Sequence, residues 1–393
     1  MKLLRMTSLV LLIVSYPFST YGEDRIMNVL YTGSLQGELE PCGCSPKTDF
    51  GGVARLSGYL AENKAVLDPF ILIDAGNFTG ENTGQGRLKA EAMIKSFSLM
   101  KYDAVAISKN EKIFESKFLE SIIREHKIPA ISGKYNLKES MELNRAGTKV
   151  NISLNIDGNR KGMLNILLTD RKLSEARGIV GWDIIILSSG EEIDEPVSFN
   201  GTVIVSGYPK GKKAGVLTIN VDDIGRVMDF SHRWQPLGDD IIESEAVRDV
   251  LNDYDRKVAA LMKEKERPQS GVTYVGVSKC GECHQIFVES WKETSHGSAF
   301  ESLINVGKSA DPECLVCHTV GYGEKGGFYS IESTPQLADV QCESCHGLDL
   351  RHLSDFSEPM KKVEKSVCLK CHTEEQSPDF EFSTYREIIR HWD

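Results

Sequence analysis

Long apolar runs are missing from this 393-residue chain beyond its first 22 residues. No later stretch approaches the roughly 20 apolar residues that a membrane-spanning helix requires. Cysteine is scarce in residues 24–238, which hold only two of the ten in the chain. Positive charge is in the minority, because the net charge is −11. Nucleic acid and anionic membrane surfaces are poor partners for such a chain, so we expect neither, and no membrane span after the first residues.

Residues 1–22 have the layout of a secretory signal peptide. Lys2 and Arg5 precede an apolar core around residues 9–14, and small or polar residues lead to Gly22. No cysteine follows the expected cleavage site after Gly22 to carry a lipid. We therefore expect a mature protein that is periplasmic or otherwise exported; its oligomeric state stays open.

The last third of the chain repeats one pattern four times: a cysteine, two other residues, a second cysteine and then a histidine. One helical turn brings the two sulfurs to the same side, where they can add to the two vinyl groups of a haem, and the adjacent imidazole reaches the iron. The pattern predicts four covalently bound c-type haems, with four proximal histidines. The motifs are Cys280/Cys283/His284, Cys314/Cys317/His318, Cys342/Cys345/His346 and Cys368/Cys371/His372.

Two other interpretations of paired cysteines are structural zinc and a disulfide framework. Two such pairs could close one tetrahedral zinc site, but zinc does not explain why a histidine follows every second cysteine. A disulfide lattice likewise places no requirement on a neighbouring imidazole. Covalent haem attachment is the interpretation that uses all three residues.

The chain has too few remaining histidines to give each of the four irons a second axial ligand. Of nine histidines, His126 and His232 lie in the first region, and four more belong to the motifs. The distal candidates are the remaining three, His296, His352 and His391.

The sixth coordination position of the fourth iron is therefore not filled by any of these three histidines. The options are Met360, a lysine, a histidine from the first region, water, or no ligand at all. His126 ends an expected helix, where a cation suits the helix dipole, so we favour a structural role for it. His232 stays a minor candidate as an axial ligand that the first region would donate to a haem of the second.

Residues 24–238 alternate apolar strands with amphipathic helices, which indicates an α/β fold. Turn signals at residues 157–159 and 223–225 suggest added antiparallel strands, so we expect a mixed sheet or a two-sheet sandwich. The expected helices cover residues 53–62, 88–100 and 114–125, and the expected strands cover residues 26–31, 70–73, 104–107, 184–187 and 203–205.

Residues 241–267 are expected to form a helical connector, with apolar residues such as Val247, Leu251 and Tyr254 on one face. Pro268 and Gly271 then break the helical pattern. Residues 268–393 have no strong strand pattern. We expect a haem domain of short helices and loops there, with the macrocycles as most of its core.

Strings beyond the four motifs add a resemblance. Residues 274–276 read Tyr-Val-Gly, residues 291–296 read W-K-E-T-S-H, and residues 341–347 read Q-C-E-S-C-H-G. With Gly326-Gly327-Phe328, these strings resemble the tetrahaem cytochrome c-554 family over residues 272–393. The resemblance implies multihaem electron transfer linked to hydroxylamine oxidation. It also implies one five-coordinate haem, usually at the second motif, here Cys314/Cys317/His318.

The first region resembles the secreted 5'-nucleotidase branch of the metallophosphoesterases, through residues 51–55 (Gly-Gly-Val-Ala-Arg) and residues 74–77 (Asp-Ala-Gly-Asn). The resemblance implies a metallophosphoesterase-like α/β sandwich with two metal ions, which hydrolysis needs for a bound hydroxide and a phosphate clamp. The family's ligands are replaced at every matching place, so we expect the metal site and phosphoester hydrolysis to be lost. The replacements are Ser34 and Gln36, Asn77, Asn110-Glu111, Ser189, and Gly207-Tyr208-Pro209-Lys210.

Cys42 and Cys44 lie beside this former metal cleft. Such a pair can ligate a metal, act as a redox-active thiol pair or form a disulfide that staples its loop. Our hypothesis is that this loop is redox active and faces the haems.

The leading functional hypothesis is a periplasmic c-type cytochrome that relays electrons through four haems between redox partner proteins. The alternative is a haem-dependent redox enzyme acting on a small nitrogen or sulfur compound. A third possibility, a 5'-nucleotidase with a haem tail, is disfavoured by the lost metal ligands.

Overall fold

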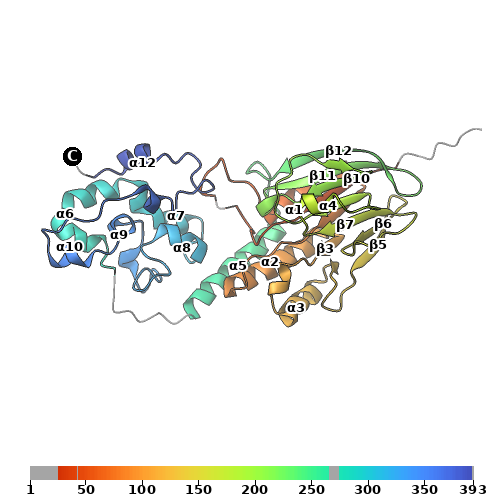
Figure 1. Cartoon of the computed structure of the whole chain (residues 1–393). Coiled ribbons are helices and arrows are strands. Elements are labelled where there is room, and N and C mark those ends of the chain that lie inside the picture. The colour runs from red at the N-terminus through yellow and green to blue at the C-terminus, as the bar shows by residue number, and fades with distance from the viewer. Residues whose placement is uncertain (1–24, 42, 265–273, 392–393) are drawn as a thin grey trace, which may run out of the picture.

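The structure is a computed structural model that describes residues 25–41, 43–264 and 274–391. The expected signal peptide, Cys42, Pro268 and Gly271 lie outside the described residues. Figure 1 shows two sheets with their helices in one part and the helices of the cysteine motifs in the other, with the long helix α5 reaching from the first part toward the second.

The first sheet has the strand order β12-β11-β1-β2-β3-β4. Strands β1 to β4 run parallel to one another, while β11 and β12 add an antiparallel hairpin at one edge. Its strands are β1 (Arg25–Thr32), β2 (Phe70–Asp74), β3 (Ala104–Ala106), β4 (Ala130–Ile131), β11 (Lys213–Val221) and β12 (Val227–Pro236).

The second sheet has the order β5-β6-β7-β8-β10-β9, with a parallel centre and antiparallel strands at both edges. Its strands are β5 (Ser140–Arg145), β6 (Thr148–Ser153), β7 (Leu164–Thr169), β8 (Ile184–Leu187), β9 (Val197–Phe199) and β10 (Thr202–Ser206). The two sheets confirm the expected α/β sandwich and all five expected strands.

Alternating side chains of the first sheet separate two apolar layers. Leu30, Leu72 and Val105 face the helices, whereas Val29, Ile71 and Ala104 face the second sheet. The outer face of the second sheet is covered by residues 173–182, including the buried Trp182. The helices of this part are α1 (Val53–Leu67), α2 (Gly84–Met100), α3 (Ser116–His126), α4 (Leu173–Ala176) and α5 (Glu245–Glu264), together with the 3-10 helices η1 (Glu111–Ile113) and η2 (Pro209–Gly211).

The turn signal at residues 157–159 does not make an antiparallel hairpin, and this expectation was wrong. Strands β6 and β7 on either side of it are parallel. The side-chain amide of Asn165 donates to the carbonyls of Arg160 and Met163, and that of Asn151 donates to the carbonyl of Gly158. These bonds hold residues 154–163 as a return loop, so the turn residues bend a crossover connection. The signal at residues 223–225 does join the antiparallel strands β11 and β12.

Helix α5 packs into the core of the α/β part. Val247, Leu251 and Tyr254 are buried among residues of α1 and α2, and Leu261 contacts Gly84 at the start of α2. The helix therefore stabilises the sandwich as well as leading toward the cysteine motifs.

The part with the cysteine motifs consists of short helices and loops, as expected, with one isolated bridge between Thr319 and Ala338. Its largest apolar cluster gathers around Phe300, Val320 and Phe328. Within the described residues, no helix is both long and apolar enough to span a membrane. The helices are α6 (Val277–Lys292), α7 (Ala299–Asn305), α8 (Pro312–His318), α9 (Cys342–His346), α10 (Leu350–Ser354), α11 (Lys365–Cys368) and α12 (Phe382–Ile388), with η3 (Ser295–Ser298) and η4 (Pro335–Leu337).

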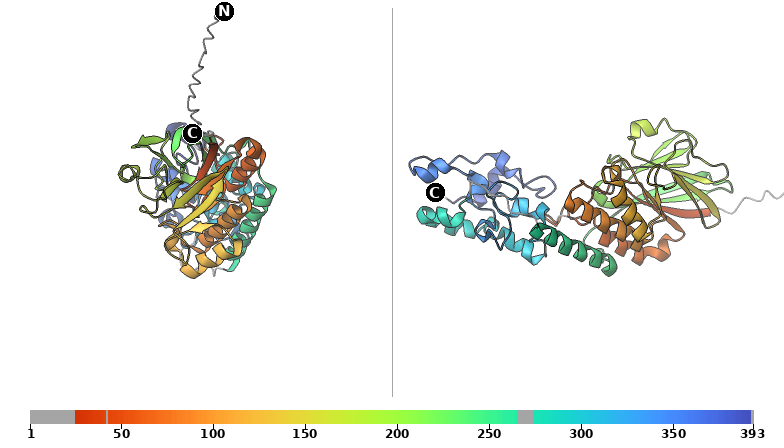
Figure 2. Two further views of the ribbon diagram at one scale, coloured as in Figure 1. Left: turned by 90° about the vertical axis from the view of Figure 1, so that its right-hand side faces the viewer. Right: turned by 90° about the horizontal axis from the view of Figure 1, so that it is seen from below.

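Figure 2 shows the two parts of the chain next to each other. They meet through polar contacts near the second and fourth motifs. Four side chains of the first part pair with acidic residues of the second: Gln85 with Asp311 at 2.9 Å, Lys89 with Glu313 at 2.7 Å, Lys47 with Asp379 at 2.7 Å and Lys212 with Glu375 at 3.1 Å. In the opposite direction, Lys308 reaches Glu40 at 2.6 Å and Asp255 at 2.7 Å.

Replacing Leu251 by alanine tests the role of α5. Leu251 is fully buried, so Leu251→Ala is expected to lower the free energy of unfolding of the α/β part by about 2–5 kcal/mol, through lost burial and the cavity left behind. Asn252→Ala, at the exposed neighbouring position, is the control and is expected to change it by less than about 0.5 kcal/mol. Urea unfolding followed by tryptophan fluorescence measures both; equal stability of the two variants would contradict the packing of α5.

Candidate haem sites and the former metal cleft

The four cysteine motifs lie on short helical segments. Motifs one to three are in α6, α8 and α9, and in the fourth the turn after α11 brings the amides of Cys371 and His372 to the carbonyl of Cys368 at 3.1 and 2.9 Å. All eight motif cysteines are free thiols, and none is fully buried. These thiols stand for the sulfurs that would become thioethers. Their free state disagrees with the disulfide interpretation.

Cys283 is the most exposed of the eight motif cysteines. Seven of the eight motif cysteines are partly covered, whereas Cys283 is exposed. The physical reason is its helix, because α6 has no buried side chain and therefore lies at the surface of this part. The role of Cys283 in haem attachment stays a prediction.

The structure brings each distal candidate opposite one proximal histidine. The pairs and their ring-centroid distances are His284 with His352 at 6.0 Å, His346 with His391 at 6.1 Å and His296 with His372 at 6.1 Å. Each pair joins residues that are distant in the sequence.

This distance matches the space that one iron would occupy. Metal–imidazole bonds are about 2.0–2.1 Å long, and each ring centre lies roughly 1 Å beyond its nitrogen, so two imidazoles on opposite sides of one ion have centres about 6 Å apart. The residues present therefore fit three irons with two imidazole ligands each.

His318, in the second motif, has no ring contact with another histidine among the described residues. Its Nδ1 atom bonds instead to the carbonyl of Ala299 at 2.6 Å, and Ser302 Oγ lies 3.3 Å away. His232 bonds to Tyr31 Oη at 2.9 Å within the first sheet, and His126 ends α3. Met360 directly precedes Lys361, whose carbonyl bonds to His346.

A hydrogen-bonding partner at Nδ1 orients three of these imidazoles. The Nδ1 atoms of His346, His352 and His372 lie 3.0, 2.6 and 3.1 Å from the carbonyls of Lys361 and Glu358 and from Ser377 Oγ. Occupied Nδ1 atoms leave Nε2 available for a metal, as in most metal-binding histidines. Sequence reasoning missed these partners because a carbonyl or serine contact leaves no pattern along the chain.

Protonation favours ligation at one pair. Burial lowers the pKa of His296, and the nearby His372 lowers it further; burial also lowers the pKa of His372. Both shifts favour the neutral imidazole, which is the form that binds iron.

Sulfur contacts place the motifs in a spatial order. The thiols of Cys280 and Cys342 lie close enough to shift each other's pKa, as do those of Cys317 and Cys371. Cys345 and Cys368 are close enough to interact electrostatically. The motifs therefore follow one another in space in the order first, third, fourth, second.

The zinc interpretation needs two cysteine pairs in one site. Among residues 25–41, 43–264 and 274–391, no group of three or more histidine, cysteine or acidic side chains is placed to hold a metal ion.

The former metal cleft is occupied by the protein's own polar groups. The fully buried Glu111 accepts hydrogen bonds from the amides of Phe78, Thr79 and Ser108 at 2.9, 3.2 and 2.8 Å. A carboxylate with this many donors is already satisfied. Asn77 accepts from Asn110 and donates to the carbonyl of Ser188 at 3.2 Å.

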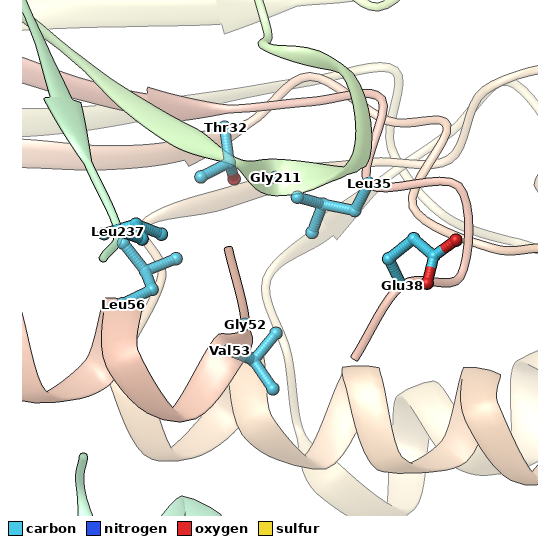
Figure 3. A pocket seen from close by; sticks show the side chains of 8 residues that line it. All are labelled: Thr32, Leu35, Glu38, Gly52, Val53, Leu56, Gly211 and Leu237. Carbon is cyan, nitrogen blue, oxygen red and sulfur yellow. The ribbon is translucent and has the colours of Figure 1, made fainter. Parts of the chain in front are cut away.

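Lys210 reaches out of this cleft toward the cysteine motifs, with an ion pair to Glu375. Its backbone amide donates to the carbonyl of Ser34 at 2.8 Å, and its φ of 57° lies in the left-handed region. A nearby pocket of about 10 Å³, close to the space of one water molecule, is shown in Figure 3. It is far too small for a nucleotide. It is lined by Thr32, Leu35, Glu38, Gly52, Val53, Leu56, Gly211 and Leu237.

Cys44 is disulfide-bonded, and Cys42 lies outside the described residues. Flanking residues reach the cysteine-motif part on both sides: Glu40 contacts Lys308 at 2.6 Å, and Thr48 donates to the carbonyl of Glu375 at 2.6 Å. The loop therefore faces that part of the chain.

Comparisons with known proteins find different relatives for the two parts of the chain. Residues 279–347 match the family model described as cytochrome c554 and c-prime. The haem-motif region is cytochrome c554-like. This likeness supports c-type haem binding there, and it includes the first three motifs; the fourth lies beyond the matched residues.

Cytochrome c-554 from Nitrosomonas europaea is 40% identical over 24% of this chain and 46% of its own length. The chain thus spans less than half of this curated relative. A 5'-nucleotidase precursor from Thermus thermophilus aligns with a TM-score of 0.50 and 15% identity, over 72% of this chain and 68% of that one. This likeness shows the metallophosphoesterase-like fold alone. The sulfate thiohydrolase SoxB of Thermus thermophilus aligns with a TM-score of 0.49 and 14% identity, over 65% of this chain and 64% of its own.

Asp74, at the end of β2, gives a pH-dependent test of the cleft. Burial raises the pKa of its carboxyl to about 7, although bonds from Thr32 and Gly76 favour the ionised form. The unfolded chain loses this proton near pH 4 and the folded protein near pH 7, so the wild type is expected to lose stability as pH rises through that window. At about 1.4 kcal/mol per pKa unit, the contribution is on the order of 4 kcal/mol.

Asp74→Asn removes the titrating group while keeping its size. Its free energy of unfolding is expected to fall less between pH 4.5 and 7.5 than that of the wild type, because other groups contribute equally to both proteins. Urea titrations at these two pH values measure the difference. Parallel pH profiles would contradict a protonated Asp74.

Proposed function

We propose that this protein is an exported electron-transfer cytochrome in which four c-type haems relay electrons between redox partner proteins. The observation that carries the proposal is the set of three imidazole pairs at 6.0–6.1 Å beside four attachment motifs. Bound haem supplies one-electron transfer between ferric and ferrous iron, with a low potential where both axial ligands are imidazole.

The spatial order of the motifs supports a relay. The cysteine sulfurs of successive motifs lie close enough to influence one another's pKa, from the first motif through the third and fourth to the second. Transfer by single steps needs neighbouring haems, and this order leaves no motif isolated. The second motif adjoins the α/β part through Glu313 and Lys89, so one end of the relay lies at that boundary.

A second candidate function rests on His318. This histidine has no imidazole opposite it among the described residues, which favours an open sixth position. A small nitrogen or sulfur compound could bind there, so the alternative of a haem-dependent redox enzyme is kept. Hydrolysis of phosphate esters is not proposed, because Glu111, Asn77 and Lys210 already occupy the cleft with internal contacts.

The proposed organisation is a signal peptide (1–22), a metallophosphoesterase-like domain (24–238), a helical connector (241–267) and a tetrahaem domain (268–393). Export takes a bacterial protein to the compartment in which haem is attached to such motifs. The net charge of −11 suits basic redox partners. Mass spectrometry of the purified protein tests the cofactor count: the expected mass is that of the mature chain plus four haems. A potentiometric titration followed at the haem absorption bands should then show four one-electron haem transitions, and a lower count in either measurement would reject the four-haem relay.

Replacing His296 tests the proposed axial pairs. His296→Ala removes the imidazole opposite His372, so one additional haem is expected to become high-spin while four haems stay attached. His126→Ala, in α3 of the first domain, is the control and should leave the spectrum unchanged. Electron paramagnetic resonance of the ferric protein measures both; a wild-type spectrum in His296→Ala would contradict the pairing.

The hypothesis of a redox-active pair at Cys42 and Cys44 is retained as a proposal. It is supported by the contacts of Glu40 and Thr48 with the haem domain. Reduction would add two electrons, one from each of two ferrous haems, and two protons from solvent, giving two thiols. Cys42→Ser with Cys44→Ser is expected to reduce by two the electrons taken up in a full reductive titration. An unchanged electron count would leave the disulfide a structural staple.

A further inference from the structure

The turn that follows the fourth motif is clamped by the former metal cleft. Residues 373–377 form this turn, in which the amide of Ser377 bonds to the carbonyl of Thr373 at 2.8 Å. Glu375 stands at its centre. The carboxylate of Glu375 pairs with Lys210, and Lys212 lies 3.1 Å from its other oxygen.

Further contacts hold the same turn from the first domain. Thr48 Oγ1 donates to the backbone carbonyl of Glu375 at 2.6 Å, and Lys47 pairs with Asp379 at 2.7 Å. The first domain therefore contacts the side chain of Glu375, the backbone carbonyl of Glu375 and the side chain of Asp379, which follows the turn. No other part of the described haem domain is held by two lysines on one carboxylate.

The clamped turn carries the group that orients a proximal histidine. Ser377 Oγ lies 3.1 Å from Nδ1 of His372, and the ring of Phe380 stacks on His372 at 4.7 Å. Hydrogen bonds to the second nitrogen of a ligating histidine fix its ring orientation and its basicity. A shift of the turn would therefore reach the iron that His372 is expected to bind.

Lys210 shows signs of a functional position. It adopts a left-handed backbone conformation, φ 57°, which a non-glycine residue rarely takes unless its surroundings impose it. Its amide is fixed to Ser34, and its ammonium also lies 3.8 Å from Glu38. Burial of Glu375 raises the pKa of its carboxyl, but the bonds from Lys210 and Lys212 outweigh burial and keep that pKa low, so the ion pair persists at neutral pH.

We propose that Lys210 and Lys212 are positioning residues for the fourth haem: through Glu375 and Ser377 they fix the orientation of His372. The degenerate hydrolase cleft thereby holds the turn at residues 373–377 of the haem domain in a fixed position. This inference rests on the proposed haem ligation, and it gives the first domain a role in the same protein.

The test is a set of full-length variants with a matched control. Lys210→Met with Lys212→Met removes the clamp, whereas Lys213→Met removes a charge from the adjacent position, where the ammonium lies 4.3 Å from the Tyr208 ring and not on Glu375. Lys210→Arg with Lys212→Arg keeps both charges and should restore the clamp.

In the clamp-free variant, one of the three low-spin ferric signals is expected to shift or broaden, with the other two unchanged. Ser377→Ala should alter the same signal, and Lys213→Met and the arginine variant should keep the wild-type spectrum. Hydrogen exchange at amides 373–377 should also quicken in the clamp-free variant alone.

Two failures are distinguishable. A wild-type protein without four haems, or without low-spin signals, would reject the proposed function itself. A normal wild-type spectrum that stays unchanged in the clamp-free variant would overturn only this inference. A shift of equal size in Lys213→Met would also overturn it, because charge rather than position would then be responsible.

Discussion

Two imidazoles can ligate one iron from opposite sides only if their ring centres lie about 6 Å apart, and the proposed ligation of the haem domain depends on that constraint. His284, His346 and His372 each meet a partner at 6.0–6.1 Å. The partners come from other helices and loops, so short elements with few buried apolar residues are held in a definite arrangement. Apart from the cluster around Phe300, the described haem domain has little apolar core of its own.

The first domain has a metallophosphoesterase-like fold, and internal polar contacts fill the cleft where the resemblance places two metal ions. In a two-metal site, the charge of the two cations normally offsets that of buried carboxylates. Here Glu111 turns to backbone amides, Asp74 has a raised pKa and Asn77 bonds to Asn110. The apolar layer between the sheets is separate from the cleft, and Lys210 of the cleft pairs with Glu375 of the haem domain.

Much of this could be predicted from the sequence, because local patterns carry it. The four motifs, the strands near residues 26–31 and 184–187, and the connector helix each follow from short spacings or periodicity. The match of His296 to His372 could not be predicted, since nothing along the chain records which distant imidazoles face each other. The exposure of Cys283 could not be predicted either, because a motif's spacing does not say which side of its helix is covered.

The turn at residues 157–159 misled for a related reason. Its residues bend the chain in the same way in a hairpin and in a crossover loop, and only the partner strands decide between them. Contacts that are distant in the sequence therefore set the limit of what local patterns can predict in both domains.

The count of spin states in the oxidised wild-type protein tests the proposed ligation most directly. Three imidazole pairs and one unpaired proximal histidine predict three low-spin haems and one high-spin haem, with only the high-spin signal responding to added cyanide or nitric oxide. Quantitative electron paramagnetic resonance on protein of known haem content gives this ratio. Four low-spin haems, or two or more high-spin ones, would contradict the arrangement of axial ligands described above.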